Sequence, residues 1–221
     1  MGTTWSHSAL KDFKTCPRKY HETKVLKLYP NEDTPQTIYG KQVHEQAEWY
    51  IRDGRPLDKS FEFMKPVLDS LIAMPGTKLC EHEMALTNAL EPCDFNDENR
   101  WVRGIADLII LNEKEGTAKV IDYKTGSDKY PDPDQLTLMA LMIFKHFPKI
   151  KSVSGALLFV LKGTMTKNKT LHEQEHVLWW RYREEVAKID KALFHNVWQE
   201  RPSGLCKRYC PCVTCPHNGR S

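Results

Sequence analysis

The sequence predicts an α/β fold in which a mixed β-sheet is flanked by helices. Three observations predict it: helical periodicities towards both ends of the chain, β-branched runs near its middle, and an apolar helix between those runs. The 221 residues are 40% hydrophobic and 28% charged, which is ordinary for a globular protein with a buried core. We therefore expect one domain over residues 1–221, with the sheet core at about 80–165 and a cysteine-rich tail at 200–221.

Three helices are expected before the sheet. The first begins after Ser6 or Ser8, which can cap it, and ends near Cys16, because Pro17 disfavours a helical conformation at the preceding residue. The other two span Tyr39–Arg52, stopped by Gly54, and Leu57–Ala73, kinked by Pro66.

A β-hairpin is the clearest local signal in the chain. It follows a strand expected at residues 80–90. Two apolar, β-branched runs lie between Gly104 and Gly126 and are separated by a polar link at Asn112–Thr117.

The hairpin carries ionisable residues among apolar ones. Residues two apart in a strand point to the same face, so Asp122 and Lys124 should emerge together, with Asp107 on the neighbouring strand. Burying an unpaired polar group costs about 2–7 kcal/mol, and an isolated charge costs more. A divalent cation would compensate the two aspartates, and a buried Asp–Lys ion pair is the alternative.

The second half of the chain alternates helices and strands. We expect a buried helix at Pro133–Phe147, a buried strand at Ser154–Leu161, an edge strand at His172–Trp179 and an amphipathic helix at Arg181–Trp198. The inner face of the last helix should consist of Tyr182, Val186, Ile189, Leu193 and Val197.

The seven cysteines are unevenly distributed. Cys80 and Cys93 lie in mid-chain and read as packing residues, whereas four lie within ten residues of the tail: Cys206, Cys210, Cys212 and Cys215. The chain has no signal-peptide pattern and no 18-residue apolar run, so we expect a cytoplasmic protein without a membrane span, in a compartment that keeps thiols reduced. Thiolates gathered at one site indicate a soft metal rather than disulfides, and free thiols are the alternative.

The hairpin resembles a known family. The pattern G-x-x-D at Gly104–Asp107, followed by D-x-K at Asp122–Lys124, is similar to the metal-site motif of the PD-(D/E)xK nucleases, in the DYKTG form of the RecB-like branch. The resemblance implies a restriction-endonuclease-like fold. It also implies Mg²⁺- or Mn²⁺-dependent hydrolysis of phosphodiester bonds.

The same resemblance implies roles for individual residues. One or two metal ions would be held by His44, Asp107, Asp122 and the main-chain carbonyl of Tyr123. Lys124 would orient the attacking water, or stabilise the pentavalent phosphorus by a direct contact. Gln135 matches the Gln of a Q-x-x-x-Y motif and would support the site, although this chain has Met139 where the family has Tyr. Taken by itself, His44 reads as a helix-surface histidine paired with Glu48.

The start of the chain resembles the opening signature of RecB-like and CRISPR-adaptation nucleases. The signature S-x-L-x-x-F-x-x-C-P-x-x-Y is matched at Ser8, Leu10, Phe13, Cys16, Pro17 and Tyr20. In iron–sulfur members this cysteine joins three tail cysteines in a [4Fe–4S] cluster that ties the two ends of the domain together. The implied ligands are Cys16, Cys206, Cys210 and Cys215. Because the tail spacing departs from the family's, a tetrahedral zinc, with His217 as a possible ligand, is the rival.

The implied function is a deoxyribonuclease, most simply an exonuclease acting on single-stranded DNA or DNA ends in recombination, repair or phage DNA processing. Basic and aromatic residues near the first helix could track the nucleic acid: Lys11, Arg18, Lys19 and Tyr20. A recombination or CRISPR-adaptation protein would be the partner. The alternatives are a nucleic-acid-binding subunit with a weak or lost site, and a zinc-dependent interaction protein.

Overall fold

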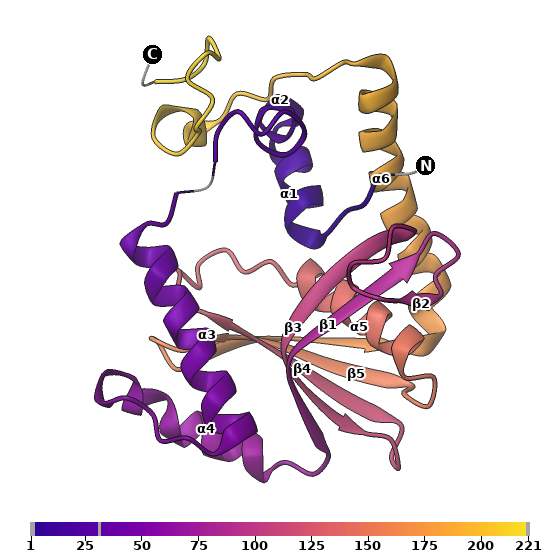
Figure 1. The fold of residues 1–221 in the computed structure, drawn as a ribbon. Coiled ribbons are helices and arrows are strands. Elements are labelled where there is room, and N and C mark those ends of the chain that lie inside the picture. The colour runs from indigo at the N-terminus through magenta and orange to yellow at the C-terminus, as the bar shows by residue number, and fades with distance from the viewer. Residues whose placement is uncertain (1–2, 31, 220–221) are drawn as a thin grey trace. The chain divides into compact units, whose positions relative to one another are not determined.

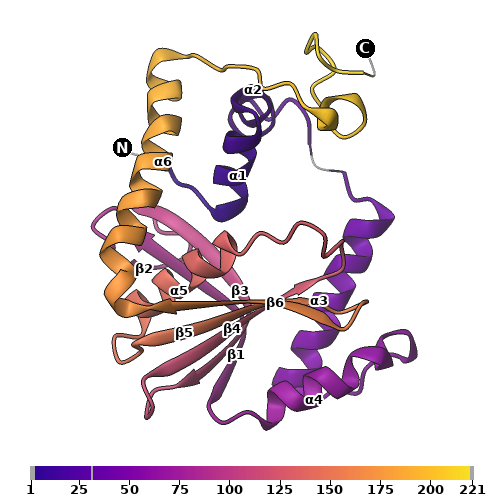
Figure 2. The ribbon, with the colours of Figure 1, turned by 180° about the vertical axis from the view of Figure 1, so that it is seen from behind.

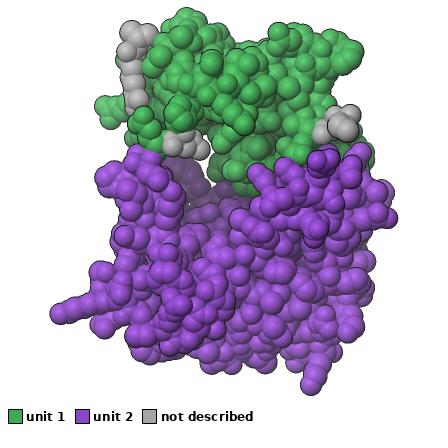
Figure 3. Space-filling model, viewed as in Figure 1, with its two compact units in different colours: residues 1–32, 180–221 green, residues 33–179 purple. Residues whose placement is uncertain are grey.

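The computed structural model of the protein describes residues 3–30 and 32–219. The chain divides into two units, one made of residues 1–32 and 180–221 and the other of residues 33–179 (Figure 3). None of the described helices is both long and apolar enough to span a membrane.

The second unit is built on a six-stranded sheet with the order β2-β1-β3-β4-β5-β6 (Figure 1). Strands β4 and β5 pair in parallel and all other neighbours are antiparallel, which confirms the expected mixed sheet. Helix α5 (Asp134–His146) forms the crossover that a parallel pair requires. The strands are β1 (Thr77–Thr87), β2 (Pro92–Cys93), β3 (Arg100–Asn112), β4 (Thr117–Lys124), β5 (Ser152–Phe159) and β6 (Thr164–Leu171).

The predicted hairpin is the pair β3 and β4. The register pairs Asn112 with Thr117 and Leu108 with Ile121. The turn contains Gly116 at φ 64°, a left-handed conformation that glycine adopts without steric cost. The alternation of this pair therefore places Asp122 and Lys124 on one face, as expected.

Helices cover the two faces of this sheet. Helices α3 (Pro35–Asp53) and α4 (Lys65–Ala73) pack on one face and α5 packs on the other (Figure 1). The core beneath α3 and α4 includes Val43, Ala47, Leu68, Leu71, Leu108, Ile110, Ile121, Tyr123, Ala156 and Leu158.

Two helix boundaries differ from expectation. Helix α3 begins four residues earlier than predicted, because Thr34 and Thr37 form a capping box ahead of Pro35, and it ends at the left-handed Gly54 as predicted. Pro66 does not kink a long helix. It lies in the first turn of α4, where its missing N–H costs nothing, and a separate 3₁₀ segment (Lys59–Met64) precedes it.

The prediction of an edge strand at His172–Trp179 is wrong. The edge strand is β6, which Figure 2 shows at the border of the sheet. Gln174 Oε1 accepts a hydrogen bond from the main-chain N–H of Leu171, which ends the strand, and α6 (Glu175–His195) begins directly afterwards. The last helix is therefore longer at its start and shorter at its end than predicted.

The first unit combines both ends of the chain. It contains α1 (His7–Thr15), capped by Ser6, then α2 (Pro17–Tyr20), a π-helical turn (His21–Val25), most of α6 and a 3₁₀ turn (Gly204–Lys207). Tyr182, Val186 and Ile189 are buried as predicted, whereas Leu193 is 37% and Val197 is 54% exposed, so the predicted inner face is wrong in its last two members.

A close approach of α5 to the sheet gives a stability prediction. A Cβ atom at Gly155 of β5 would lie 2.8 Å from Leu136 Cβ, so the helix would have to move. We expect Gly155→Ala to lower the free energy of unfolding by about 1–3 kcal/mol, measured by urea denaturation. Gly126→Ala is the control, because a Cβ there has no neighbour within 4 Å, and it should change stability by less than about 0.5 kcal/mol. Equal effects of the two variants would contradict the packing argument.

Candidate metal centre

Three elements of the second unit bring an imidazole and two carboxylates together. His44 comes from α3, Glu81 from β1 and Asp107 from β3, and one ligand atom of each lies within 4.8 Å of the other two. His44 Nδ1 is 3.4 Å from Asp107 Oδ2 and 3.6 Å from Glu81 Oε1. His44 Nε2 lies 3.2 Å from the carbonyl oxygen of Tyr123. His44 Nδ1, Asp107 Oδ2 and Glu81 Oε1 form a group that could surround one cation, and the Tyr123 carbonyl faces the other ring nitrogen of His44.

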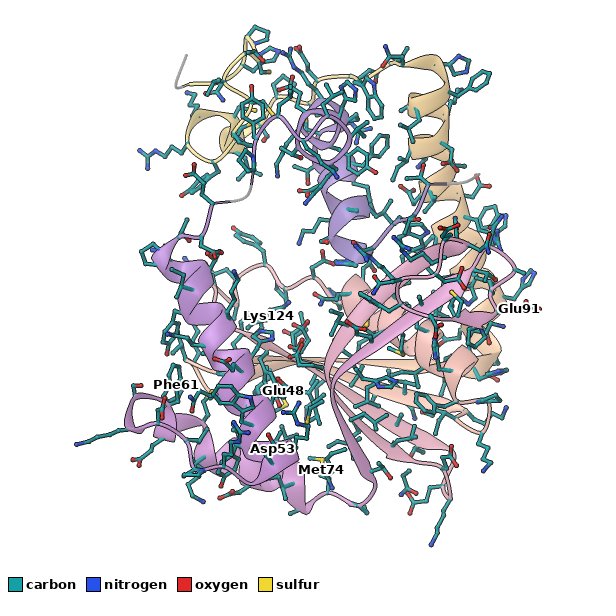
Figure 4. All side chains as sticks on the ribbon, in the orientation of Figure 1. Glu48, Asp53, Phe61, Met74, Glu91 and Lys124 are labelled. Carbon is teal, nitrogen blue, oxygen red and sulfur yellow. The ribbon has the colours of Figure 1, made fainter. Side chains whose placement is uncertain are left out.

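A second group adjoins it through β4. Asp122 is 6% exposed, and its carboxylate contacts Lys124 Nζ at 2.5 Å and accepts a hydrogen bond from the Gln135 amide. Lys124 Nζ also donates to Gln135 Oε1 at 3.1 Å. Lys124 is the last residue of β4 (Figure 4). The sequence therefore predicted correctly that these side chains share a face.

The main chain of β4 connects the two groups. The N–H of Tyr123 donates a hydrogen bond of 2.7 Å to Asp107 Oδ2, while the carbonyl of the same residue faces His44. Asp107 thus faces both the histidine and the strand that carries Asp122. All of the predicted catalytic and metal residues of the hairpin lie together with His44 and Gln135.

Glu81 is the residue that sequence reasoning missed. The ladder pairs Cys80 with Leu108 and His82 with Ala106, which places Glu81 opposite Asp107. Its backbone has φ 45°, a conformation that is rare for residues other than glycine. Like charges placed opposite each other in a sheet destabilise it. A strained glutamate held there needs a positive charge between the strands.

Ionisation in the site follows from this crowding. Burial lowers the pKa of His44, but hydrogen bonding to Asp107 and Glu81 and their negative charge outweigh it and raise the pKa to about 10. Burial and the negative charge of Asp107 raise the pKa of Asp122 to about 6, against the opposing effect of Lys124. A protonated imidazole therefore supplies the positive charge between the carboxylates when no metal is bound.

Met139 stands at the position where the family motif has Tyr, and its packing accounts for the difference. It is 4% exposed, and its terminal methyl group would lie 2.4 Å from a Cβ atom at Gly104 of β3. The side chain therefore fills the space above a glycine in the core beneath α5.

The four cysteines predicted to bind a metal or cluster lie around one cavity in the first unit. Cys16, Cys206, Cys210 and Cys215 line a cavity of about 70 Å³, together with Cys212 and His217. Burial, followed by the negative charge of Cys210, raises the pKa of the Cys212 thiol. Among the described residues, no three ligand atoms of the tail lie within 4.8 Å of one another, as a single tetrahedral ion would need.

Three of the predicted nucleic-acid residues have partners within the first unit. Tyr20 is 4% exposed, with its ring against Phe13 and Trp198, so a stacking role would require this packing to open. Arg18 contacts Glu22, Glu200 and Thr214. Lys19 pairs with Asp12 at 2.9 Å, and Lys11 is exposed.

Comparisons with known proteins give the family. The model of the PD-(D/E)XK nuclease superfamily matches residues 4–216. The chain belongs to this superfamily. Membership supports a hydrolase that acts on nucleic acid, and the six-stranded mixed sheet flanked by helices agrees with the superfamily's fold.

Two solved structures are similar to this member of the superfamily. A presumed exonuclease from Eubacterium rectale has a TM-score of 0.52 and 13% identity, covering 93% of this chain and 86% of its own. The structure of SSO0001 has a TM-score of 0.49 and 16% identity, covering 99% of this chain and 88% of its own. At such identities the likeness concerns the fold alone. No curated protein matches the sequence significantly.

The pKa of His44 gives a prediction about metal binding. Because the imidazole carries a proton near neutral pH and a ligand must give it up, Mn²⁺ binding should release protons. We expect the affinity to rise by up to about tenfold per pH unit between about pH 6 and 8. Calorimetry in buffers of different ionisation enthalpy measures the proton count. Binding at pH 7 without proton release would contradict the prediction.

Glu81 gives a second prediction about the same ion. Glu81→Gln preserves the size of the side chain but removes one negative charge next to Asp107. We expect Mn²⁺ to bind about 10–100-fold more weakly, measured by calorimetry. Glu83→Gln on the same strand, outside the group of three ligand atoms, should leave the affinity unchanged.

Proposed function

We propose that the protein is a Mg²⁺- or Mn²⁺-dependent deoxyribonuclease that degrades single-stranded DNA or DNA ends as an exonuclease. The observation that carries the proposal is the buried Asp122 carboxylate, held by the half-buried Lys124 and Gln135, next to the group of His44, Glu81 and Asp107. Oxygen-rich ligand sets favour hard divalent cations, and one imidazole shifts the preference towards manganese.

His44, Glu81, Asp107, Asp122 and the carbonyl of Tyr123 would hold the ion. When bound, the ion acidifies a water molecule and offsets negative charge on the scissile phosphate. Since these ligands come from a helix and three strands, the site is positioned by the sheet rather than by loops.

Lys124 would act directly on the reacting groups. Its ammonium group is held by Asp122 and by the Gln135 carbonyl, which restrict its position. From there it would donate a hydrogen bond to the attacking water or to a phosphate oxygen and stabilise the charge that develops in the transition state. Gln135 contacts both Lys124 and Asp122 and would keep the two in place.

The family model spans residues 4–216 and thus includes parts of both units. We therefore propose that the whole chain forms one nuclease domain. Its tail would hold a [4Fe–4S] cluster through Cys16, Cys206, Cys210 and Cys215, with a structural role. The cavity that all four cysteines line supports a common site for them.

A cleavage assay tests the nuclease. Purified protein is incubated with Mn²⁺ and labelled single-stranded and duplex DNA, each with free or blocked ends. We expect stepwise degradation of single strands with free ends. The absence of cleavage on all substrates, or cleavage unchanged in Asp122→Ala and Lys124→Ala, would overturn the proposal.

The metal content of the protein tests the tail. Anaerobically purified protein should be brown, with about four irons per chain. Cys210→Ser should lose the colour, and Cys80→Ser, a half-buried thiol of the other unit, should keep it. A colourless protein that releases zinc would support the rival ion instead.

A further inference from the structure

The loop at residues 125–133 begins and ends at the candidate site. It joins Lys124, at the end of β4, to Gln135, in the first turn of α5. These two side chains are hydrogen-bonded to each other. Any residue of this loop therefore lies within a few residues of the catalytic lysine, the Asp122 carboxylate or the glutamine that holds them.

A further contact fixes the middle of the loop. Asp128 accepts hydrogen bonds from Lys162 and, at 3.1 Å, from Thr164 Oγ1. Thr164 pairs with Phe159, which pairs with Lys124 on the other side. Because neighbouring strands are about 4.8 Å apart, Thr164 lies roughly 10 Å from Lys124. Asp128 is thus held at the sheet end that carries the site.

Tyr130 follows two residues after this anchor and is 91% exposed, more than any other large apolar or aromatic side chain described. Two residues span at most about 7 Å, so Tyr130 lies at the same end of the sheet as the site. Pro131 and Pro133 restrict the backbone beyond it, and Lys129 is exposed beside it. No aromatic contact within the described chain occupies its ring.

We propose that Tyr130 is a stacking platform for a base of single-stranded nucleic acid, a few nucleotides from the scissile phosphate. The proposal rests on the proposed nuclease function and deepens it. An exposed aromatic ring offers a face to any base, so it favours unpaired strands without sequence preference. Lys129 would attract the neighbouring phosphates.

Kinetics with short single-stranded DNA tests the platform. Tyr130→Ala should raise KM about tenfold and leave kcat within about twofold, because only binding is lost. Tyr130→Phe keeps the ring and should behave as the unsubstituted protein. Phe194→Ala removes an 86% exposed ring of the other unit and is the matched control.

A direct binding measurement separates this proposal from the nuclease itself. Single strands carrying 2-aminopurine should lose fluorescence on binding in Ca²⁺ without Mn²⁺, and Tyr130→Ala should abolish most of this quenching. Unchanged KM and quenching in Tyr130→Ala, or an equal loss in Tyr130→Phe, would overturn the platform. Quenching that depends on Tyr130 in a protein that cleaves nothing would support the platform and reject the nuclease.

Discussion

Asp107→Asn is expected to lower kcat/KM for Mn²⁺-dependent DNA cleavage by about a thousandfold, equivalent to ~4 kcal/mol. Asp107 Oδ2 lies 3.4 Å from His44 Nδ1 and accepts the 2.7 Å hydrogen bond from the Tyr123 N–H. Asparagine retains an oxygen for the hydrogen bond from the main chain and removes the charge. The loss therefore reports on the cation rather than on the packing of β3 and β4.

A matched substitution controls for the loss of a carboxylate elsewhere. Asp69 lies on α4 of the same unit, where it is exposed and paired with Lys65. Exposed pairs of this kind contribute little to stability. Asp69→Asn should leave cleavage unchanged. If Asp107→Asn kept more than a tenth of the activity while remaining folded, the carboxylate would not be holding the catalytic ion.

The hairpin was predictable from the sequence because its information is local. A two-residue period places Asp122 and Lys124 on one face, and the short polar link brings Asp107 onto the neighbouring strand. His44 lies 63 residues before Asp107, and no local period connects the two. Only the resemblance to a family indicated that α3 would bring the histidine to the sheet.

Glu81 and the edge strand show where local patterns fail. Glu81 reaches the site through a left-handed backbone and its position opposite Asp107, neither of which leaves a mark in the sequence. Residues 172–176 are polar and residues 177–179 are apolar, so the segment lacks a strand's alternation and fits the start of a helix. The strand β6 is polar on its exposed face, with Lys167 and Lys169, and so lacks the apolar signal expected of a strand.

Lys124→Met is expected to lower kcat by about 10²–10⁴-fold and to leave Mn²⁺ binding intact. Methionine has nearly the same length but no charge, so the Asp122 carboxylate loses its 2.5 Å contact and Gln135 Oε1 loses its donor. Removing this positive charge removes a direct repulsion of the ion, so calorimetry at a pH well above the pKa of Asp122 should show equal or tighter binding. Lys119→Met, an exposed lysine on the same strand, is the control and should retain full activity. A group that acts on the water or the phosphate must change kcat even when Mn²⁺ is saturating. If a fall in Mn²⁺ affinity accounted for all of the lost activity, Lys124 would have a structural role and the prediction would be wrong.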